Sequence, residues 1–253
     1  MADEKQKWPD WLWIVRHGQS ASNVARRLAE EAAQEDIGIS IRDVDVELSA
    51  LGQAQARAVG RWFGNRPTDE RPNVVLVSPY RRAVQTAQLI CQEGGITVRR
   101  EDGSYVVDER LREKEFGVLT GLTRAGIASR HPNEYELRML FGKFYHRPPG
   151  GESYCDVIMR LRSFLGTVTR DHAAGDRVLI VCHSVVVNCF RYLLERMNFT
   201  DRAEHLHDLL WEKPLSWVPL EPTRRGLPVA NPKPIERNER WRVRVLRYPE
   251  TDQ

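Results

Sequence analysis

The chain has 253 residues, 41% hydrophobic and 29% charged, so it can bury a large core, and we expect a single domain over residues 1–253. The net charge of +3 is small, and acidic residues are interleaved with the basic ones, which excludes the profile of a nucleic-acid-binding protein. The four cysteines form no CxxC pair and no zinc-ligand spacing, so we predict neither a metal site nor a disulfide framework.

The chain opens with the polar sequence MADEKQKWPD, which contains no apolar signal core. No later stretch is long and apolar enough to span a membrane. We therefore expect a soluble, cytoplasmic protein with free thiols and no membrane partner. The composition leaves the oligomeric state open.

The first predicted strand covers residues 11–15 and ends in Arg-His-Gly at positions 16–18. Residues 20–34 are rich in Ala, Arg, Glu and Leu, which predicts a helix. Residues 37–47 have no clean periodicity and are expected to form a loop. The opening segment therefore carries a cation, a histidine and a glycine where a strand passes into a helix.

The next predicted helix covers residues 48–63, where the apolar residues share one face. Residues 73–77, NVVLV, form a short continuous apolar run, which is typical of a strand buried on both faces of a parallel sheet. A helix is predicted from Pro79 to the Gly-Gly pair at 94–95. Residues 96–99 are a candidate for a further short strand.

Residues 118–151 are irregular, rich in aromatic and basic side chains, and end in Pro-Pro-Gly-Gly. This composition predicts an insertion outside the core, which is where a fold of this kind carries its substrate specificity. A helix over residues 153–171 follows, then a buried strand over 177–182 and a helix over 184–197. The second strand thus repeats the pattern of the first, with a histidine at its end.

Residues 215–253 read as a C-terminal extension, with many prolines and an alternating stretch at 241–248 that could close the sheet at an edge. Taken together, the order of elements predicts a three-layer α/β fold. Its central sheet should be mostly parallel, with helices on both faces and the insertion near the active site.

Three strand-to-helix junctions carry polar side chains, at residues 16–18, 78–83 and 182–184. In a doubly wound sheet such junctions meet at one edge, where ligands bind. Two histidines and at least two arginines gathered there would form a pocket for a phosphoryl group. A neutral imidazole could attack the phosphorus, and a carboxylic acid of raised pKa could protonate the leaving alkoxide.

Six separated motifs in this order resemble those of the histidine phosphatase superfamily, which includes phosphoglycerate mutases and fructose-2,6-bisphosphatases. The motifs are RHGQSASN, DVELSALGQAQA, SPYRRAVQTA, LREKEFG, PPGGESY and VCHS. The resemblance spans roughly residues 11–197 and implies the family's α/β fold and phosphohistidine chemistry. The bisphosphatase branch is the more similar one.

The resemblance implies a role for several side chains in this pocket. His17 would be the nucleophile that becomes phosphohistidine, and the phosphoryl oxygens would be bound by Arg16, Asn23, Arg82 and His183. Arg81 should instead be a solvated surface residue, because it points about 100° away around its helix.

The general acid is expected to be Glu113, which matches the glutamate of the family's Leu-x-Glu motif. Glu115 and Glu109 remain rivals in the same charged segment. Glu152, in the GES turn, is expected to brace the site.

The bisphosphatase pattern further implies substrate contacts by Arg138, Lys143 and Tyr154, and Ser184 is a candidate beside His183. The sequence departs from that pattern where Arg124 replaces a ligand tyrosine and where Ser184 and Asn188 replace a glutamine and an arginine. These departures leave fructose bisphosphate itself in doubt.

The remaining histidines lie in polar surroundings without metal-ligand spacing, and we expect surface positions for His131, His146, His172, His205 and His207. Cys182 is expected to be a small core residue, because its side chain points away from that of His183 on a strand.

We therefore predict a metal-independent phosphatase acting on a small phosphorylated substrate, with no cofactor. One alternative is a phosphoglycerate mutase, which would need bisphosphoglycerate as a cofactor. Another is a non-catalytic protein that binds a phosphorylated ligand.

Overall fold

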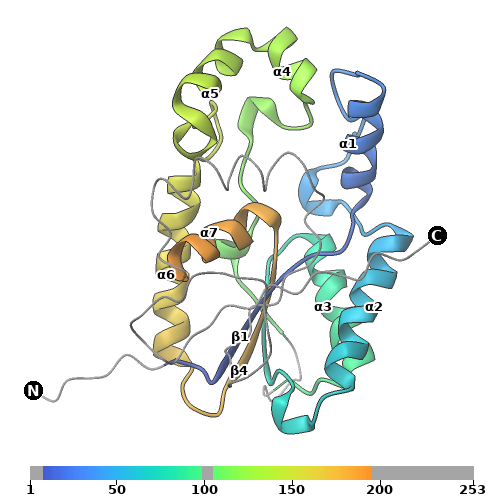
Figure 1. The fold of residues 1–253 in the computed structure, drawn as a ribbon, viewed down its shortest axis with the longest axis vertical. Coiled ribbons are helices and arrows are strands. Elements are labelled where there is room, and N and C mark those ends of the chain that lie inside the picture. Colours follow the sequence, from blue (N-terminus) through green and yellow to red (C-terminus); the bar gives the residue numbers. More distant parts are fainter. Residues whose placement is uncertain (1–7, 99–104, 195–253) are drawn as a thin grey trace, which may run out of the picture.

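A four-stranded sheet forms the centre of the computed structural model, which describes residues 8–98 and 105–194 (Figure 1). The strands follow the order β1-β4-β2-β3, and each neighbouring pair is parallel. Their bounds are β1 Trp11–Arg16, β2 Val74–Val77, β3 Val106–Val107 and β4 Arg177–Cys182. The strands predicted over residues 11–15, 73–77 and 177–182 are confirmed, as is the parallel sheet.

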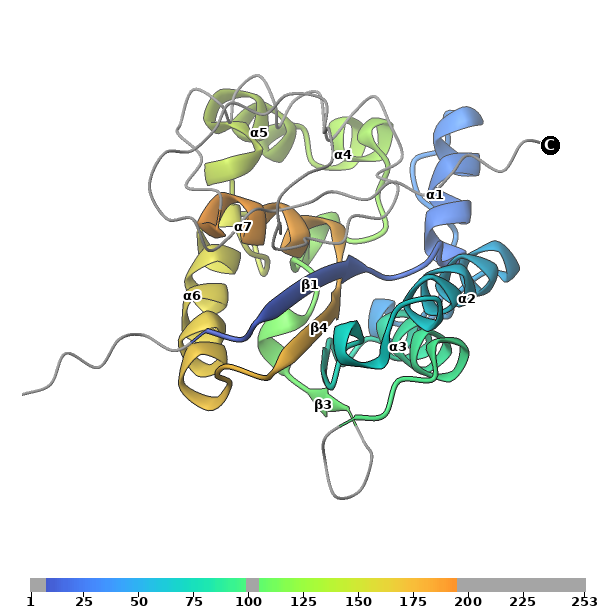
Figure 2. The same ribbon diagram turned by 60° about the horizontal axis from the view of Figure 1, so that its bottom comes forward.

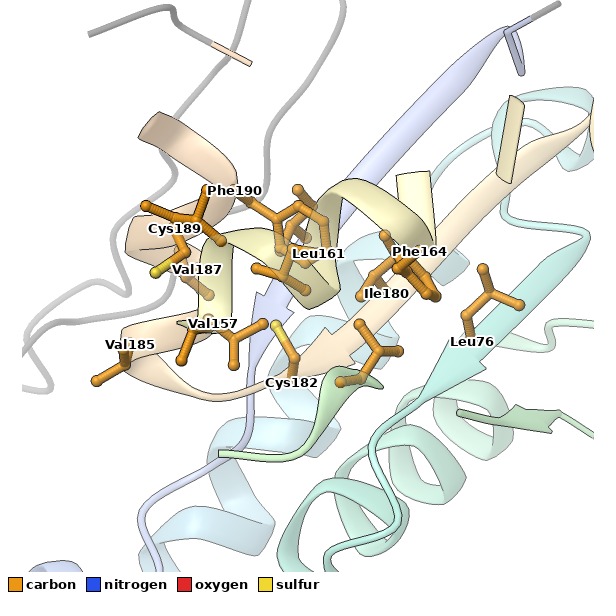
Figure 3. Packing of buried hydrophobic residues seen from close by; sticks show 14 of the residues in the cluster. Leu76, Val157, Leu161, Phe164, Ile180, Cys182, Val185, Val187, Cys189 and Phe190 are labelled. Atoms are coloured by element: carbon orange, nitrogen blue, oxygen red, sulfur yellow. The ribbon is translucent and has the colours of Figure 1, made fainter. Parts of the chain in front are cut away.

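Helices cover both faces of this sheet, because neighbouring residues of a buried strand point to opposite sides. From β4, Val178 and Ile180 belong to the buried cluster that includes α6 (Tyr154–Asp171) and α7 (Ser184–Leu194). Figure 3 shows Ile180 among side chains of these two helices. Leu179 and Val181 instead face α2 (Ala50–Gly64) and α3 (Arg81–Gly94). Figure 2 shows the two helical layers with the sheet between them. The predicted three-layer α/β fold is confirmed.

Serine residues cap the first turn of three helices in this fold. The Ser20 side chain accepts from the backbone N–H of Asn23 at the start of α1 (Ala21–Glu31), and Ser49 accepts from Gly52 at the start of α2. Ser153 begins α6, where the Asp156 carboxylate bonds back to its backbone N–H. Such caps satisfy N–H groups that have no partner within the helix.

Residues 118–151, expected to be irregular, are largely helical. They contain α4 (Arg124–Arg130) and α5 (Pro132–Tyr145), with a kink at Gly142, whose φ is 69°. No residue of α5 is buried, and Leu140 is 75% exposed. The apolar side chains therefore show no buried stripe, and periodicity could not reveal this helix.

The strand predicted over residues 96–99 is wrong in its described part, residues 96–98. Residues 96–98 form no strand, although Ile96 and Val98 are buried against α3 and its neighbours. The fourth strand is instead β3, which has only two residues and pairs with the end of β2. A strand this short leaves no alternation for sequence analysis to detect.

Short 3-10 turns complete the described elements: η1 Asp43–Asp45, η2 Thr68–Glu70, η3 Glu109–Leu111 and η4 Gly117–Leu119. Several predictions lie outside the described residues: the end of the helix at 195–197, the extension at 215–253 with its strand, and His205 and His207. Across the described helices, none combines the length and the apolar character that crossing a bilayer requires.

Candidate active site

The three polar junctions meet at the carboxyl edge of the sheet. The backbone N–H of His17 donates to the Cys182 carbonyl at 2.9 Å, and that of Ser78 donates to the Val181 carbonyl at 3.0 Å. Because β1, β4 and β2 are neighbours, the residues that follow them are held side by side. The convergence predicted from the sequence is thus present.

His17 is buried, with only 4% of its surface exposed. Its Nδ1 lies 2.6 Å from the Gly18 carbonyl, which can only accept, so Nδ1 carries the hydrogen and Nε2 has the lone pair. Arg82 Nε donates to that Nε2 at 3.2 Å. Burial, and then the charges of Arg82 and Arg16, hold the pKa of His17 well below its ordinary value. The ring is therefore neutral and suited to nucleophilic attack through Nε2.

His183 is fully buried beside His17, with the two ring centroids 5.1 Å apart. Its Nε2 lies 2.7 Å from the Ser78 hydroxyl, and its Nδ1 has no hydrogen-bond partner within residues 8–98 and 105–194. Burial, and then the nearby His17 and Arg82, lower the pKa of His183 well below its ordinary value. One ring nitrogen therefore remains for a bound anion.

Two arginines supply positive charge to this pocket. Arg82, on the first turn of α3, is 4% exposed, and its guanidinium lies 4.7 Å from the centre of the Tyr80 ring. Arg16 ends β1 and is half-buried, and burial lowers its pKa while the charge of Glu113 opposes that shift. Arg81 is exposed and pairs with Glu47 at 2.6 Å, as expected for a surface residue.

Among the three candidate acids, Glu113 has the environment that general acid catalysis requires. It is 8% exposed, and burial raises the pKa of its carboxyl, although the backbone N–H of Lys114 and the two arginines oppose this. Glu115 is half-exposed and accepts from the Tyr80 hydroxyl, and Glu109 is exposed. Of the three, only Glu113 is thus buried near Arg16 and Arg82 with a raised pKa.

Glu152 braces the segment that carries Glu113. Its carboxylate accepts from Arg160 at 2.9 Å, from Arg112 at 3.0 Å, and from the backbone N–H of Glu115 at 3.0 Å. Arg160 also donates to the Glu113 carbonyl at 3.3 Å. Burial opposes ionisation of Glu152, but the bonds from Arg160 and Glu115 outweigh it and lower its pKa, which suits an anchor for this segment.

The predicted phosphate contact Asn23 lies at the start of α1. Its carboxamide oxygen accepts from the backbone N–H of Ser20 at 3.1 Å and so helps to cap the helix. This assigns the oxygen to the helix and leaves the amide NH2 group to meet a phosphoryl oxygen.

The predicted substrate contacts come from three helices. Arg138 and Lys143 belong to α5, Tyr154 opens α6 and is 5% exposed, and Ser184 opens α7. Burial, and then the charges of Arg138 and Arg124, lower the pKa of Lys143 to about 8.

Two positions that depart from the bisphosphatase pattern have clear surroundings. Arg124 donates to the Tyr135 hydroxyl at 3.0 Å, on the insertion. Asn188 is 9% exposed, and its amide nitrogen has no hydrogen-bond partner in the described part of the chain.

The expectation of a surface position for His146 was wrong, because this residue is 6% exposed and pairs with Glu134 at 3.0 Å. His131 and His172 are half-buried.

Sequence reasoning missed four residues around the site. Ser78 bonds His183, and Thr86 accepts from the Gly18 N–H at 3.1 Å while its hydroxyl donates to the Arg82 carbonyl. Lys114 is 7% exposed, and burial followed by the Arg138 charge lowers its pKa to about 8. Asp43 binds Arg82 from η1. Ser78, Thr86 and Lys114 stand inside quoted motifs, and Ser78 also opens the second polar junction, whereas Asp43 had no signal.

The loop after His17 depends on two glycines that face each other. A Cβ on Gly18 would lie 2.3 Å from the Gly52 carbonyl oxygen, and a Cβ on Gly52 would lie 1.9 Å from the Gln19 carbonyl oxygen. Both separations are far below van der Waals contact, so the backbones approach only because both residues lack side chains.

The chain matches the sequence model of a known protein family. Residues 12–226 match the sequence model described as "Histidine phosphatase superfamily (branch 1)". The chain belongs to this superfamily. The match covers most of the chain and includes both histidine junctions, so the family inferred from the motifs is confirmed.

This histidine phosphatase superfamily member is similar to proteins with different named activities. It is 32% identical over 183 residues to a putative phosphoserine phosphatase 2 from Hydrogenobacter thermophilus, covering 72% of this chain and 77% of the relative. It is 30% identical over 188 residues to the 2,3-bisphosphoglycerate-dependent phosphoglycerate mutase 2 of Gloeobacter violaceus, covering 74% and 76%.

A solved structure supports the fold. The mycobacterial glucosyl-3-phosphoglycerate phosphatase superposes with a TM-score of 0.60 at 25% identity, covering 85% of this chain and 92% of that one. Relatives of this superfamily member therefore include both phosphatases and mutases.

Proposed function

We propose that this protein is a phosphatase that hydrolyses the phosphate monoester of a small metabolite through a phosphohistidine at His17. The observation that carries the proposal is the state of His17: a buried, neutral imidazole whose Nε2 lone pair faces Arg82. The buried acid Glu113, near the same arginines, supplies the second requirement. Nothing in this reaction requires a metal ion.

In the first step, Nε2 of His17 attacks the phosphorus atom as the bond to the leaving oxygen breaks. Glu113 gives its proton to that oxygen, so an alcohol leaves and N-phosphohistidine remains. Arg16, Arg82, His183 and the Asn23 amide bind the phosphoryl oxygens, on which negative charge is spread in the transition state.

In the second step, the ionised Glu113 takes a proton from a water molecule, whose oxygen attacks the phosphorus. The bond from phosphorus to Nε2 breaks, and inorganic phosphate leaves. Glu113 is then protonated and His17 neutral again, so the cycle closes without a co-reactant.

For the substrate, we propose a second anionic group that contacts the insertion. Burial lowers the pKa of both Arg138 and Lys143, and repulsion from the nearby Arg138 charge lowers that of Lys143 further. An anion between them would relieve that repulsion. Tyr154 and Ser184 would contribute hydroxyl groups.

A mutase is the second candidate, because a relative of 30% identity carries that name. It would use the same residues but keep the phosphoryl group, with bisphosphoglycerate as donor. Incubation with 3-phosphoglycerate, with and without bisphosphoglycerate, separates the two candidates. Isomerisation faster than phosphate release would contradict the phosphatase.

The proposal is tested by measuring phosphate release from p-nitrophenyl phosphate and a panel of sugar and amino-acid phosphates. We expect turnover by the wild type and loss of at least about 10³-fold in His17→Ala, because no other nucleophile replaces Nε2. Quenching with an alkaline denaturant should trap a phosphoryl group on the wild type alone, and later acid treatment should release it. No release by the wild type, with His17→Ala unchanged, would favour a non-catalytic phospho-ligand-binding protein.

A further inference from the structure

Arg82 is shared between the catalytic histidine and a carboxylate from a distant part of the chain. Its Nη1 donates to the Asp43 carbonyl at 2.6 Å and to Oδ1 at 3.0 Å, and its Nη2 donates to Oδ2 at 3.0 Å. A guanidinium has five N–H groups. The Nε–H therefore points at His17, and one Nη2 hydrogen remains beside it for a phosphoryl oxygen.

The Asp43 carboxylate thus binds the outer edge of the Arg82 guanidinium. The inner edge of the same guanidinium is the one that would bind the phosphoryl oxygens. Arg82 is buried, whereas the Asp43 side chain is 43% exposed on η1. The negative charge of Asp43 repels a phosphoryl dianion and competes with it for the same cation. Asp43 must therefore weaken anion binding as long as its charge remains.

Asp43 is not needed to hold Arg82 in position. The bond from Nη1 to the Asp43 main-chain carbonyl is the shortest of the three and survives any change of the side chain. The Tyr80 ring under the guanidinium and the burial of Arg82 on α3 also remain. Removing the carboxylate should consequently remove charge while largely keeping geometry.

We propose that Asp43 sets the phosphate affinity of the pocket by sharing Arg82 with the bound phosphoryl group. This inference rests on the proposed phosphatase function. A hydrolase must release inorganic phosphate at the end of each cycle, and tight binding of that product gives no gain in turnover. An internal anion behind the binding arginine keeps that affinity low.

The test is calorimetric titration of the full chain with inorganic phosphate. Asp43→Asn should bind phosphate about tenfold more tightly than the wild type, because one screened negative charge next to the anion is lost. Asp43→Glu keeps the charge and should stay near the wild-type value. The inhibition constant of phosphate in the p-nitrophenyl phosphate assay should fall in parallel for Asp43→Asn.

Glu47→Gln is the matched control. Glu47 belongs to the same loop and pairs with the neighbouring Arg81, but that pair is exposed and outside the pocket. Its phosphate affinity should be unchanged. An equal gain in Glu47→Gln would mean that any lost surface charge suffices, and it would overturn the proposal, as would unchanged or weaker binding by Asp43→Asn.

Folding and function are checked separately. Thermal melting curves verify that the variants are folded. If the Asp43→Asn variant does not fold, Asp43→Ser, which keeps the main-chain carbonyl, replaces it. If the wild type does not bind phosphate, or if Arg82→Ala binds it equally well, the proposed phosphatase site fails. If the wild type binds phosphate through Arg82 and Asp43→Asn brings no gain, only the role of Asp43 is wrong.

Discussion

At the scale of single residues, the environment decides which of several similar side chains can act. Glu109, Glu113 and Glu115 lie within one charged segment, yet only Glu113 is buried. Burial disfavours its ionised form and raises its pKa, so the proton is retained at pH values where an exposed glutamate has lost it. The same type of residue is buried with a raised pKa at one position and half-exposed two residues later.

Replacing Glu113 by Gln should lower kcat/KM about 10²- to 10³-fold for an alkyl phosphate, because the leaving alkoxide is no longer protonated. The loss of kcat/KM on p-nitrophenyl phosphate should be much smaller, since nitrophenolate leaves without help and kcat/KM does not include the later attack of water, which Glu113 assists for both esters. Activity of the wild type on the alkyl ester should fall as the pH rises through the raised pKa of Glu113. Steady-state kinetics on both substrates across pH measure these effects.

Glu115→Gln serves as the control, because this half-exposed carboxylate bonds the Tyr80 hydroxyl. It should show no difference between the two leaving groups. Equal losses of kcat/KM on both substrates in Glu113→Gln would contradict the assignment of Glu113 as the acid.

At the scale of elements, the site depends on the close approach of the loop after β1 to the first turn of α2. The Ser49 N–H donates to the Gln19 carbonyl at 2.9 Å, and Gly52 faces that same residue. The sequence shows Gly18 and Gly52 but does not indicate that they are in contact, because they are far apart along the chain.

Gly52→Ala should destabilise the fold by about 1–3 kcal/mol and lower kcat/KM, because a methyl group would push the Gln19 backbone and the loop of His17 aside. Gly166→Ala lies at an exposed position of α6, where an added Cβ would meet no atom within 4 Å outside the backbone of its own helix. It should instead raise the free energy of unfolding by up to about 1 kcal/mol. Urea denaturation of both variants measures the free energy of unfolding. A Gly52→Ala variant as stable as the wild type would show that this approach is not tight.

Elements with a buried face were predictable, and those without one were not. The strands over residues 74–77 and 177–182 have continuous apolar runs, and α6 has a regular apolar stripe. By contrast, α5 has no buried residue, and β3 has two residues. Hydrophobic periodicity reports burial, so it gives no signal where an element lies on the surface or is very short.

At the scale of the whole molecule, two neutral histidines are enclosed in one cationic pocket. Both pKa values lie below 6.5 in the folded state. The unfolded chain therefore binds protons first as the pH falls below 6.5, and the free energy of unfolding decreases there. The raised pKa of Glu113 acts in the opposite direction, since it favours the protonated folded state.

Unfolding measured between pH 7 and 5 should show a decrease of up to about 1.4 kcal/mol per pH unit for each histidine. His183→Asn should remove part of that slope, because the asparagine side chain does not titrate. The difference between wild type and variant isolates the histidine from the carboxylates. Parallel curves for the two proteins would contradict the low pKa of His183.

By itself, the sequence determined the family, the parallel sheet and the gathering of two histidines with arginines at its carboxyl edge, because these follow from local patterns at strand ends. Only the tertiary structure decided which carboxyl has a raised pKa, how His17 is oriented, and that Asp43 binds the outer edge of Arg82. Burial and electrostatic coupling depend on neighbours from other elements. Residues 43 and 82 meet because η1 packs against α3, which no spacing along the chain encodes.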